Sequence, residues 1–152
     1  MKAVIQRVKH ASVVVEGKTV GAIGEGLMIL LGVAEGDTEQ DAQLLCRKIA
    51  NLRIFEDENG KMNRSVKDID GEMLVVSQFT LLANYRHGNR PDFLASAKPQ
   101  EADRLYEYFK ELAAGEVRRV ASGIFGAHME VTLQNHGPVT IVMDSEVLKS
   151  KK

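Results

Sequence analysis

Cysteine and proline are scarce in this sequence, and long apolar runs are missing from it. Cys46 is the only cysteine, so no disulfide can form within the chain, which suits a reducing compartment. There are only three prolines, Pro91, Pro99 and Pro138, and no low-complexity linker divides the chain. The longest apolar run, residues 27–33, is much shorter than the ~20 residues of a membrane-spanning helix. We therefore expect a single domain over residues 1–152 and no membrane partner.

Positive and negative charges are nearly balanced in the sequence. The chain has 20 lysines and arginines against 21 aspartates and glutamates, which gives a net charge of −1. Proteins that wrap long stretches of nucleic acid are usually basic, so we expect no DNA partner, and an RNA would be held by a short end. Residues 1–4 continue into strand-like sequence without the pattern of a secretory signal. These features favour the cytoplasm.

The residues that are present are typical of a globular domain, with 44% hydrophobic and 27% charged. A domain of this length buries roughly 70% of the surface of its unfolded chain, so folding requires neither a disulfide nor a metal. Apolar runs that alternate or are rich in β-branched residues predict nine strands. We place them at residues 4–8, 11–15, 19–23, 27–33, 52–55, 73–81, 117–120, 129–134 and 138–143.

Apolar residues at helical spacing predict two main helices. The first follows Asp37, an expected N-cap, and its apolar face is formed by Ala42, Leu45, Cys46 and Ile49. The second begins at Pro99 and ends near Gly115, and its stripe is formed by Ala102, Leu105, Tyr106, Phe109 and Leu112. Because strands cluster rather than alternate with helices, we expect an α+β fold with a mixed or antiparallel sheet. The tail, residues 146–152, is expected to be frayed.

A polar segment at the end of the strand expected over residues 73–81 could carry chemistry. Ser77 and Thr80 offer hydroxyls, and Gln78 offers an amide that can donate and accept. Backbone N–H groups that leave the strand ladder here, such as that of Phe79, could stabilise an oxyanion. From composition alone, polar residues where a strand leaves the sheet are the simpler interpretation.

A second segment, residues 135–140, has the sequence Asn-His-Gly-Pro-Val-Thr. Asparagine, glycine and proline together predict a tight turn. The bond before Pro138 could be cis, as roughly 5–6% of such bonds are, but the local sequence does not decide this. An ordinary turn between Gln134 and Ile141 is the simplest interpretation.

A third segment, residues 86–91, is a cationic loop that contains Arg86, His87, Gly88 and Arg90. Two guanidinium groups on a flexible loop could hold phosphate or the 3′ end of an RNA. A solvated loop without a ligand explains the same residues.

Patterns of other site classes are missing. The histidines, at positions 10, 87, 128 and 136, show no close paired spacing, so nothing predicts a zinc site. No nucleophile elbow, phosphate-binding glycine loop or dinucleotide fingerprint is present. A serine-histidine-aspartate triad remains open, because triads are assembled from distant residues.

Together these segments resemble the D-aminoacyl-tRNA deacylase family, from Met1 to about Asp144. The two most specific matches are residues 77–81 and 135–140, which have the separation typical of that family. Further matches in the same order are residues 6–8 with 11–13, residues 88–91 with Phe93, the pair Leu105-Tyr106, and residues 123–129. The sequence departs from the family pattern at His136, where an aspartate is usual.

The resemblance implies a homodimer with active sites at the subunit interface and no metal or organic cofactor. It implies that Gly137-Pro138 is cis and reaches into the partner's pocket, where its carbonyls meet the substrate's amino group. The residues it implies for catalysis are Ser77, Gln78, Phe79 and Thr80. Those implied for substrate binding and chiral selection are Gly137, Pro138, Met129 and Phe125. Arg86 and Arg90 are expected to contact the RNA.

The resemblance implies that the reaction is hydrolysis of D-aminoacyl-tRNA, such as D-tyrosyl-tRNA, with glycyl-tRNA as a further substrate. Thr80 could be the nucleophile, but the sequence places no base beside it. We favour a scheme in which the protein positions the ester and the ribose 2′-hydroxyl helps to activate water. Three other functions stay open: a hydrolase of free D-amino-acid esters or small peptides, a non-catalytic RNA-binding or editing module, and a structural dimer.

Overall fold

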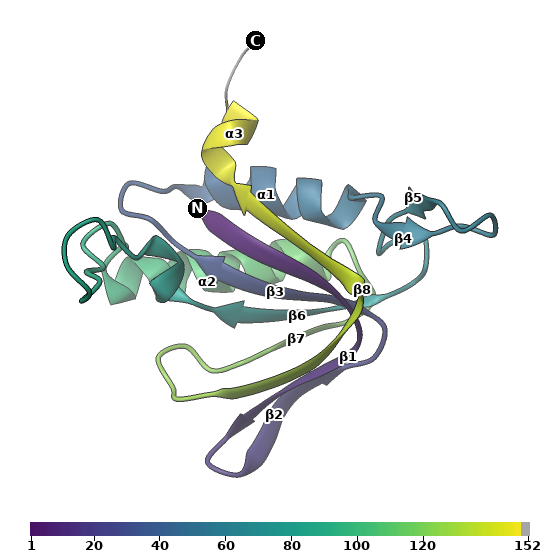
Figure 1. Ribbon diagram of the computed structural model, residues 1–152, viewed down its shortest axis with the longest axis horizontal. Coiled ribbons are helices and arrows are strands. Elements are labelled where there is room, and N and C mark those ends of the chain that lie inside the picture. The colour runs from purple at the N-terminus through teal and green to yellow at the C-terminus, as the bar shows by residue number, and fades with distance from the viewer. Residues whose placement is uncertain (150–152) are drawn as a thin grey trace.

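The computed structural model describes residues 1–149, and its main sheet is built around one long strand. This strand, β1 (Lys2–Val15), pairs with β8 (Glu130–Asp144) along almost its whole length. The other edge of β1 is shared, because its first half pairs with β3 (Gly26–Gly32) and its second half with β2 (Lys18–Ile23). The sheet bends where β1 passes from one partner to the next, as Figure 1 shows.

Parallel strands extend the sheet beyond β3. β3 pairs in parallel with β6 (Glu72–Ser77), and β6 pairs in parallel with β7 (Val120–Ser122). The other pairs in this sheet are antiparallel, and the strand order is β2-β1-β3-β6-β7. A separate hairpin consists of β4 (Phe55–Glu56) and β5 (Met62–Arg64). The expected α+β class with a mixed sheet is therefore confirmed.

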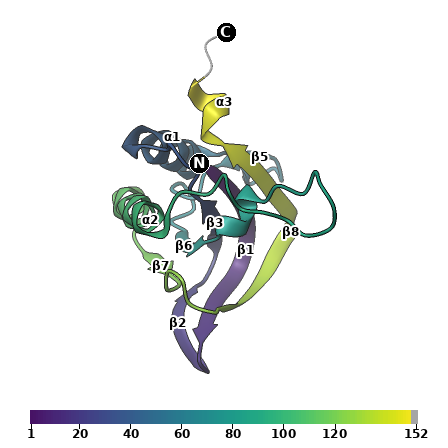
Figure 2. The same ribbon diagram turned by 90° about the vertical axis from the view of Figure 1, so that its left-hand side faces the viewer.

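Two main helices, α1 (Glu39–Asn51) and α2 (Pro99–Ala114), pack on the same face of the sheet (Figure 2). All nine apolar residues expected on their inner faces pack in the core there, although Leu112 is only partly buried. The opposite face closes on itself, and Val13, Met28 and Val76 form a second core inside the curl. Within residues 1–149, no helix is long and apolar enough to span a lipid bilayer.

The start of α1 differs from the expectation, whereas Pro99 and Gly115 bound α2 as predicted. The N-cap of α1 is Thr38, not Asp37. The Asp37 carboxylate instead accepts a hydrogen bond of 2.7 Å from the backbone N–H of Ala34 and closes the loop before the helix. Asp37, which lies between an apolar strand and a helix, thus stabilises the loop and does not cap the helix.

Two pairs of expected strands are each one strand in the structure. Residues 4–8 and 11–15 belong to β1, and residues 129–134 and 138–143 belong almost entirely to β8. The register between β1 and β8 shifts twice near Val8, and pairing resumes after each shift. Bulges absorb the extra residues, so glycine and proline interrupt the ladder without ending the strand.

Three other strand boundaries were also wrong. The strand expected over residues 73–81 ends at Ser77, and a short 3₁₀ helix, η1 (Phe79–Leu82), follows it. The strand expected at residues 117–120 lies three residues later, as β7. The strand expected at residues 52–55 is reduced to β4. Each error falls at an element end, where local preference is weak and tertiary pairing decides.

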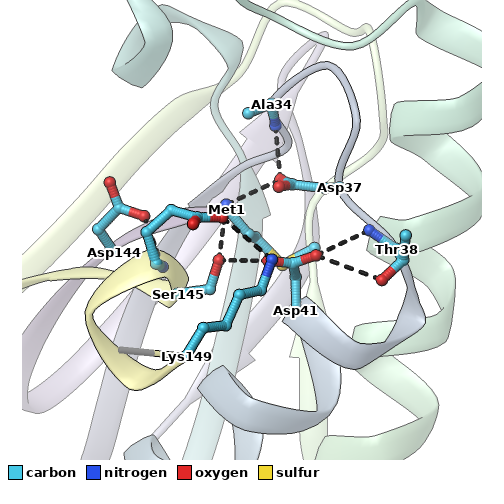
Figure 3. Close-up of polar contacts among 9 residues, drawn as sticks. Met1, Ala34, Asp37, Thr38, Asp41, Asp144, Ser145 and Lys149 are labelled. Atoms are coloured by element: carbon cyan, nitrogen blue, oxygen red, sulfur yellow. Dashed lines mark hydrogen bonds and ion pairs between the residues drawn. The ribbon is translucent and has the colours of Figure 1, made fainter. Parts of the chain in front are cut away.

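The C-terminal segment is helical as far as the structure describes it. Residues Ser145–Lys149 form helix α3, so the fraying expected for the tail is wrong there, and residues 150–152 lie outside the described chain. The buried Ser145 hydroxyl donates to Asp41 Oδ1 at 2.6 Å and accepts from the Met1 α-ammonium at 2.9 Å. Lys149 Nζ lies 2.6 Å from the same Asp41 oxygen (Figure 3).

Asp41 is fully buried at the centre of this cluster. Burial raises the pKa of its carboxyl group, but hydrogen bonds from Lys149, Ser145 and the Thr38 backbone outweigh burial. Together they lower the pKa from 3.8 to about 2. Asp41 is therefore ionised near neutral pH and ties α3 to α1.

Candidate active site

A cavity of about 760 Å³ lies at the carboxyl ends of the parallel strands β3 and β6. Its wall includes Val33, which follows β3, and Val76 and Ser77, which end β6. Residues 125–129, which lead into β8, complete another side. The volume is within the range of ~300–1,000 Å³ that is usual for small-molecule sites. Ligand sites commonly occur at this end of parallel strands, where backbone groups leave the ladder.

The polar segment after β6 lies where the sequence predicted a site. The backbone N–H of Gln78 donates to Leu31 O at 2.8 Å, and the chain then turns into η1. Because η1 begins at Phe79, its first backbone N–H groups have no acceptor inside the helix. Ser77, Gln78 and Phe79 all line the cavity, so an oxyanion donor at this strand end is structurally available.

Gly32 allows η1 to approach the end of β3 closely. A Cβ atom at this position would lie 2.7 Å from Leu82 Cδ2 and 3.0 Å from Gln78 O. Such distances would push the whole segment away from the sheet. The position of the cavity wall therefore depends on the absence of a side chain at Gly32.

Thr80 lies beside the cavity wall rather than in it. Its side chain is exposed, and its hydroxyl oxygen accepts a hydrogen bond from Gln78 Nε2. Within the described chain, no carboxylate or imidazole hydrogen-bonds to this hydroxyl. The arrangement makes Thr80 a support for Gln78 and gives it no base that would activate it as a nucleophile.

Aromatic and thioether side chains form the apolar part of the cavity. Phe125 and Met129 line it as expected, and the Phe125 ring lies 6.1 Å from that of Tyr106. Burial raises the pKa of the Tyr106 hydroxyl to about 12, so it stays protonated and donates to Val75 O at 2.9 Å. Two further lining residues, Phe79 and Phe93, pack edge-on with 5.0 Å between ring centroids.

Three ionisable side chains line the cavity: Glu35, Lys98 and His128. Sequence reasoning assigned none of them to the site, because Glu35 and Lys98 come from separate loops that only the fold brings together. Among residues 1–149, no group of three or more histidine, cysteine, aspartate or glutamate side chains converges as a metal site would require.

The segment from Asn135 to Thr140 is a bulge in the middle of β8. β1 pairs with β8 at Thr140 and again at Asn135, so the four residues between them leave the ladder. Asn135 spans the bulge, because its Oδ1 accepts from the Val139 N–H at 2.7 Å and its Nδ2 donates to Thr140 Oγ1 at 3.1 Å. The simple turn interpretation is wrong, since the chain keeps its direction.

Gly137 and Pro138 are exposed at the tip of this bulge, and the bond between them is cis, as the family resemblance implied. Gly137 has φ of +146°, a conformation that residues with a side chain rarely adopt. The His136 side chain is exposed too, and its carbonyl accepts a hydrogen bond from the Arg7 side chain.

Arg7 holds the bulge from beneath, and sequence reasoning missed its role. Its side chain is only 5% exposed, and its Nε donates to His136 O at 2.7 Å. Nη1 donates to Ile54 O at 2.9 Å. The signal was available, because Ala3, Ile5 and Arg7 alternate on the buried face of β1, where an arginine is unusual.

The bulge and the cavity lie at different ends of the sheet within one chain. The bulge faces Val8, which pairs with Gly26 at the start of β3, whereas the cavity lies beyond the end of β3. Figure 1 shows the bend of β8 on one side and the tips of β6 and β7 on the other. Gly137 and Pro138 therefore do not line the cavity of their own chain.

Arg86 and Arg90 also lie outside the cavity, on an exposed loop that follows η1. The loop returns to the cavity at Phe93 and Leu94, which line it. The structure thus brings together five of the residues expected in the site: Ser77, Gln78, Phe79, Phe125 and Met129.

Residues 4–144 match the family model described as D-Tyr-tRNA(Tyr) deacylase. A protein of Caldicellulosiruptor saccharolyticus named D-aminoacyl-tRNA deacylase is 59% identical over 146 residues, which is 96% of this chain and 98% of that protein. A protein of Dehalococcoides mccartyi with the same name is 61% identical over 145 residues, 95% of each chain.

Two solved structures are similar over nearly the whole chain. One is named c-Myc DNA Unwinding Element Binding Protein, with a TM-score of 0.90, 46% identity, and coverage of 95% of this chain and 98% of that one. The other is described as a probable eukaryotic D-amino acid tRNA deacylase, with a TM-score of 0.78 and coverage of 93% and 97%. At 16% identity, the second likeness concerns the fold alone.

Proposed function

This chain belongs to the D-Tyr-tRNA(Tyr) deacylase family, and on that premise we propose that it hydrolyses the ester between a D-amino acid and the terminal ribose of transfer RNA. The observation that carries the proposal is the cavity at the end of β6, which combines an apolar wall with the polar residues Ser77 and Gln78. It acts in the cytoplasm, where charged transfer RNA is used. In the proposed reaction the catalytic groups come from the protein and the RNA, without a metal or organic cofactor.

The proposed reaction needs positioning more than side-chain chemistry, because an ester is already activated. Water attacks the carbonyl carbon, the bond to the ribose oxygen breaks, and that oxygen takes a proton as the free amino acid leaves. The Phe79 backbone N–H is the donor we assign to the carbonyl oxygen as negative charge develops there. The ribose 2′-hydroxyl assists the water, while Thr80 holds the Gln78 amide in place.

We further propose that the active unit is a homodimer in which each Gly137-Pro138 enters the partner's cavity. Three features support this: the tip of the bulge is exposed, it lies away from its own cavity, and Arg7 holds it in position. The outer edge of β8 is unpaired within the described chain, and Val142 on it is 77% exposed. Long edge strands with exposed apolar residues are usually covered.

Rigid backbone near the substrate Cα provides the proposed choice between enantiomers. An L-residue would direct its side chain at Gly137-Pro138 and be excluded, whereas a D-residue would direct it elsewhere. Glycine has no side chain to exclude, so glycyl-tRNA is a second proposed substrate. Because backbone makes the choice, the identity of the D-side chain should matter little.

The deciding experiment compares D-tyrosyl-tRNA with L-tyrosyl-tRNA as substrates of the purified protein. We expect release of D-tyrosine and no measurable release of L-tyrosine. Efficient cleavage of the L-form would contradict the proposed chiral selection, and no cleavage of either would leave a non-catalytic RNA-binding module as the better description.

Two controls separate the remaining functions. A D-tyrosine methyl ester tests the hydrolase of free esters, and we expect it to be a poor substrate because it lacks the nucleoside that fills the cavity. A single-stranded DNA oligonucleotide tests the activity named for the similar DNA-unwinding-element-binding protein, and we expect it not to compete with charged transfer RNA.

A further inference from the structure

The loop from Asn84 to Asp92 is a preformed projection at the rim of the cavity. Two backbone hydrogen bonds between Asn84 and Asp92, of 2.8 and 3.0 Å, close its base. The Asn84 side chain accepts from the Arg86 N–H at 3.1 Å, and Gly88 has a positive φ of 65°. Figure 2 shows the loop as the teal segment that reaches out from the body of the molecule. A closed base orients the loop even though its side chains are exposed.

The cations of this loop have no partners in the described chain. Six of the nine arginines donate side-chain hydrogen bonds to named acceptors, whereas Arg86 and Arg90 donate none and form no ion pair. The one acidic residue of the loop, Asp92, lies at its base and accepts from the Leu94 N–H at 3.2 Å. The projection therefore presents two free guanidinium groups in a chain with a net charge of −1.

Large exposed side chains lie close to the same arginines in the sequence. Tyr85, which directly precedes Arg86, is 81% exposed, and Leu94 is 82% exposed. Leu94 and Phe79 line the cavity, so the loop that carries Tyr85, Arg86 and Arg90 leaves the cavity wall after η1 and returns to it at Phe93. Aromatic faces interleaved with free cations are the pattern that binds single-stranded nucleic acid, by base stacking and phosphate pairing.

We propose that the loop from Asn84 to Asp92 binds the unpaired nucleotides that precede the terminal nucleoside of the RNA. Tyr85 stacks on a base, and Arg86 and Arg90 take the phosphates on either side of it. The identity of the RNA rests on the proposed function, and the rim position supplies the geometry. In this arrangement the RNA leaves the cavity across Phe79 and Leu94, two exposed residues of its wall.

A substrate without upstream nucleotides isolates this contact. We compare D-tyrosyl-tRNA with D-tyrosyl-adenosine, which fills the cavity but cannot reach the loop. For Tyr85→Ala, the ratio of kcat/KM for the long substrate to that for the short one should fall roughly tenfold, mostly through KM. Tyr85→Phe should restore the ratio, because stacking needs the ring and not the hydroxyl.

The arginines are tested by salt dependence. For Arg86→Gln/Arg90→Gln, the slope of log kcat/KM against log salt should become shallower by about 1.4, the value for two phosphates of a single strand. Arg47→Gln is the matched control, because Arg47 is exposed on α1 and its side chain has no partner in the described chain. It should keep the wild-type slope.

Three other outcomes overturn the inference. Equal losses on both substrates would mean that the loop shapes the cavity, and a smaller particle mass for the variants would mean that a second copy covers it. An unchanged kcat/KM on both substrates would mean that the loop does not contact the RNA. If the wild type cleaves neither substrate, the proposed function fails instead. The inference is then tested by the anisotropy of a labelled single-stranded RNA that ends in CCA, which Tyr85→Ala should bind roughly tenfold more weakly.

Discussion

At the scale of single residues, Thr80 separates two chemical schemes. Its hydroxyl accepts from Gln78 and has no base beside it in the described chain. We predict that Thr80→Ala lowers kcat for D-tyrosyl-tRNA by less than about tenfold, which is the loss of one supporting hydrogen bond of roughly 1 kcal/mol. Single-turnover kinetics at saturating substrate measure it, and a loss of several orders of magnitude with the fold intact would make Thr80 the nucleophile.

His128 supplies the control for that experiment. It lines the cavity and is the only imidazole that does so among the described residues. If the RNA rather than a side chain assists the water, His128→Ala should also keep most of the activity. A large loss in this variant alone would identify a protein base and contradict the scheme.

Arg7 joins stability to function through the bulge that it supports. Replacing its side chain would leave the carbonyl of Ile54 without its donor in a buried setting and that of His136 without its donor in a part-buried one. We predict that Arg7→Met lowers the free energy of unfolding by roughly 2–4 kcal/mol, because both hydrogen bonds involve a charged donor. Urea unfolding gives this value, and Arg7→Lys should not restore it fully, because lysine lacks the forked geometry.

The same variant should weaken the choice between enantiomers, since a loosened bulge no longer presents Gly137-Pro138 rigidly. The ratio of cleavage rates for D- and L-tyrosyl-tRNA measures this. An Arg7→Met protein that is less stable but equally selective would separate the bulge from chiral selection.

At the scale of elements, periodicity predicted both main helices and most strands but not their ends, and it missed β5, η1 and α3. The apolar spacing in α1 and α2 was decisive, because each inner face carries four or more residues in phase. The bulge in β8 and the turn into η1 could not be predicted, because both depend on partners far along the chain. Arg7 on β1 donates to His136 O in the bulge, and Gly32 at the end of β3 leaves room for η1, and no local pattern encodes either contact.

The site was predictable to a similar degree. Of the residues expected in the site, 77–79, Phe125 and Met129 line one cavity, whereas Thr80, Gly137 and Pro138 do not. Glu35 and Lys98 were not predictable, because a lone charged residue in a loop carries no signal until the fold places it. The burial of Arg7 could be predicted, because it interrupts an otherwise apolar face of β1. Its partner on β8, the carbonyl of His136, could not be predicted.

Helix α3 gives the fold a measurable dependence on acid. The folded-state pKa of Asp41 is lowered to about 2, so the ionised group stabilises the fold above its ordinary value of 3.8. That contribution is lost as pH falls from about 4 to about 2, and the shift corresponds to roughly 2 kcal/mol. We predict that Asp41→Asn flattens the dependence of unfolding free energy on pH in this window.

Lys149→Ala is the companion to that measurement. It removes the ion pair to Asp41 but leaves the Ser145 hydrogen bond, so part of the acid dependence should remain. Denaturant unfolding at a series of pH values compares the two variants with the wild type. Equal slopes in all three proteins would mean that the α3 contacts contribute nothing to stability in solution.

At the scale of the whole molecule, a dimer with shared sites predicts complementation between two inactive variants. Ser77→Trp fills the cavity but keeps the bulge, and Gly137→Val distorts the bulge but keeps the cavity, because a Cβ there lies 2.8 Å from Val139 Cγ2. Each homodimer should be inactive. Mixed dimers formed by co-refolding should regain roughly a quarter of the wild-type sites, because half are mixed and each restores one of two sites.

Both variants are first checked for native mass and circular dichroism, so that a loss of activity is not a loss of fold. Mixing after folding, without exchange of subunits, should give no recovery and serves as the control. If co-refolded mixtures stay inactive although mixed dimers are present, each site is complete within one chain. Because the bulge and the cavity lie at different ends of the sheet, a complete site would then require a rearrangement within the monomer, and the exposed tip of the bulge would need another partner.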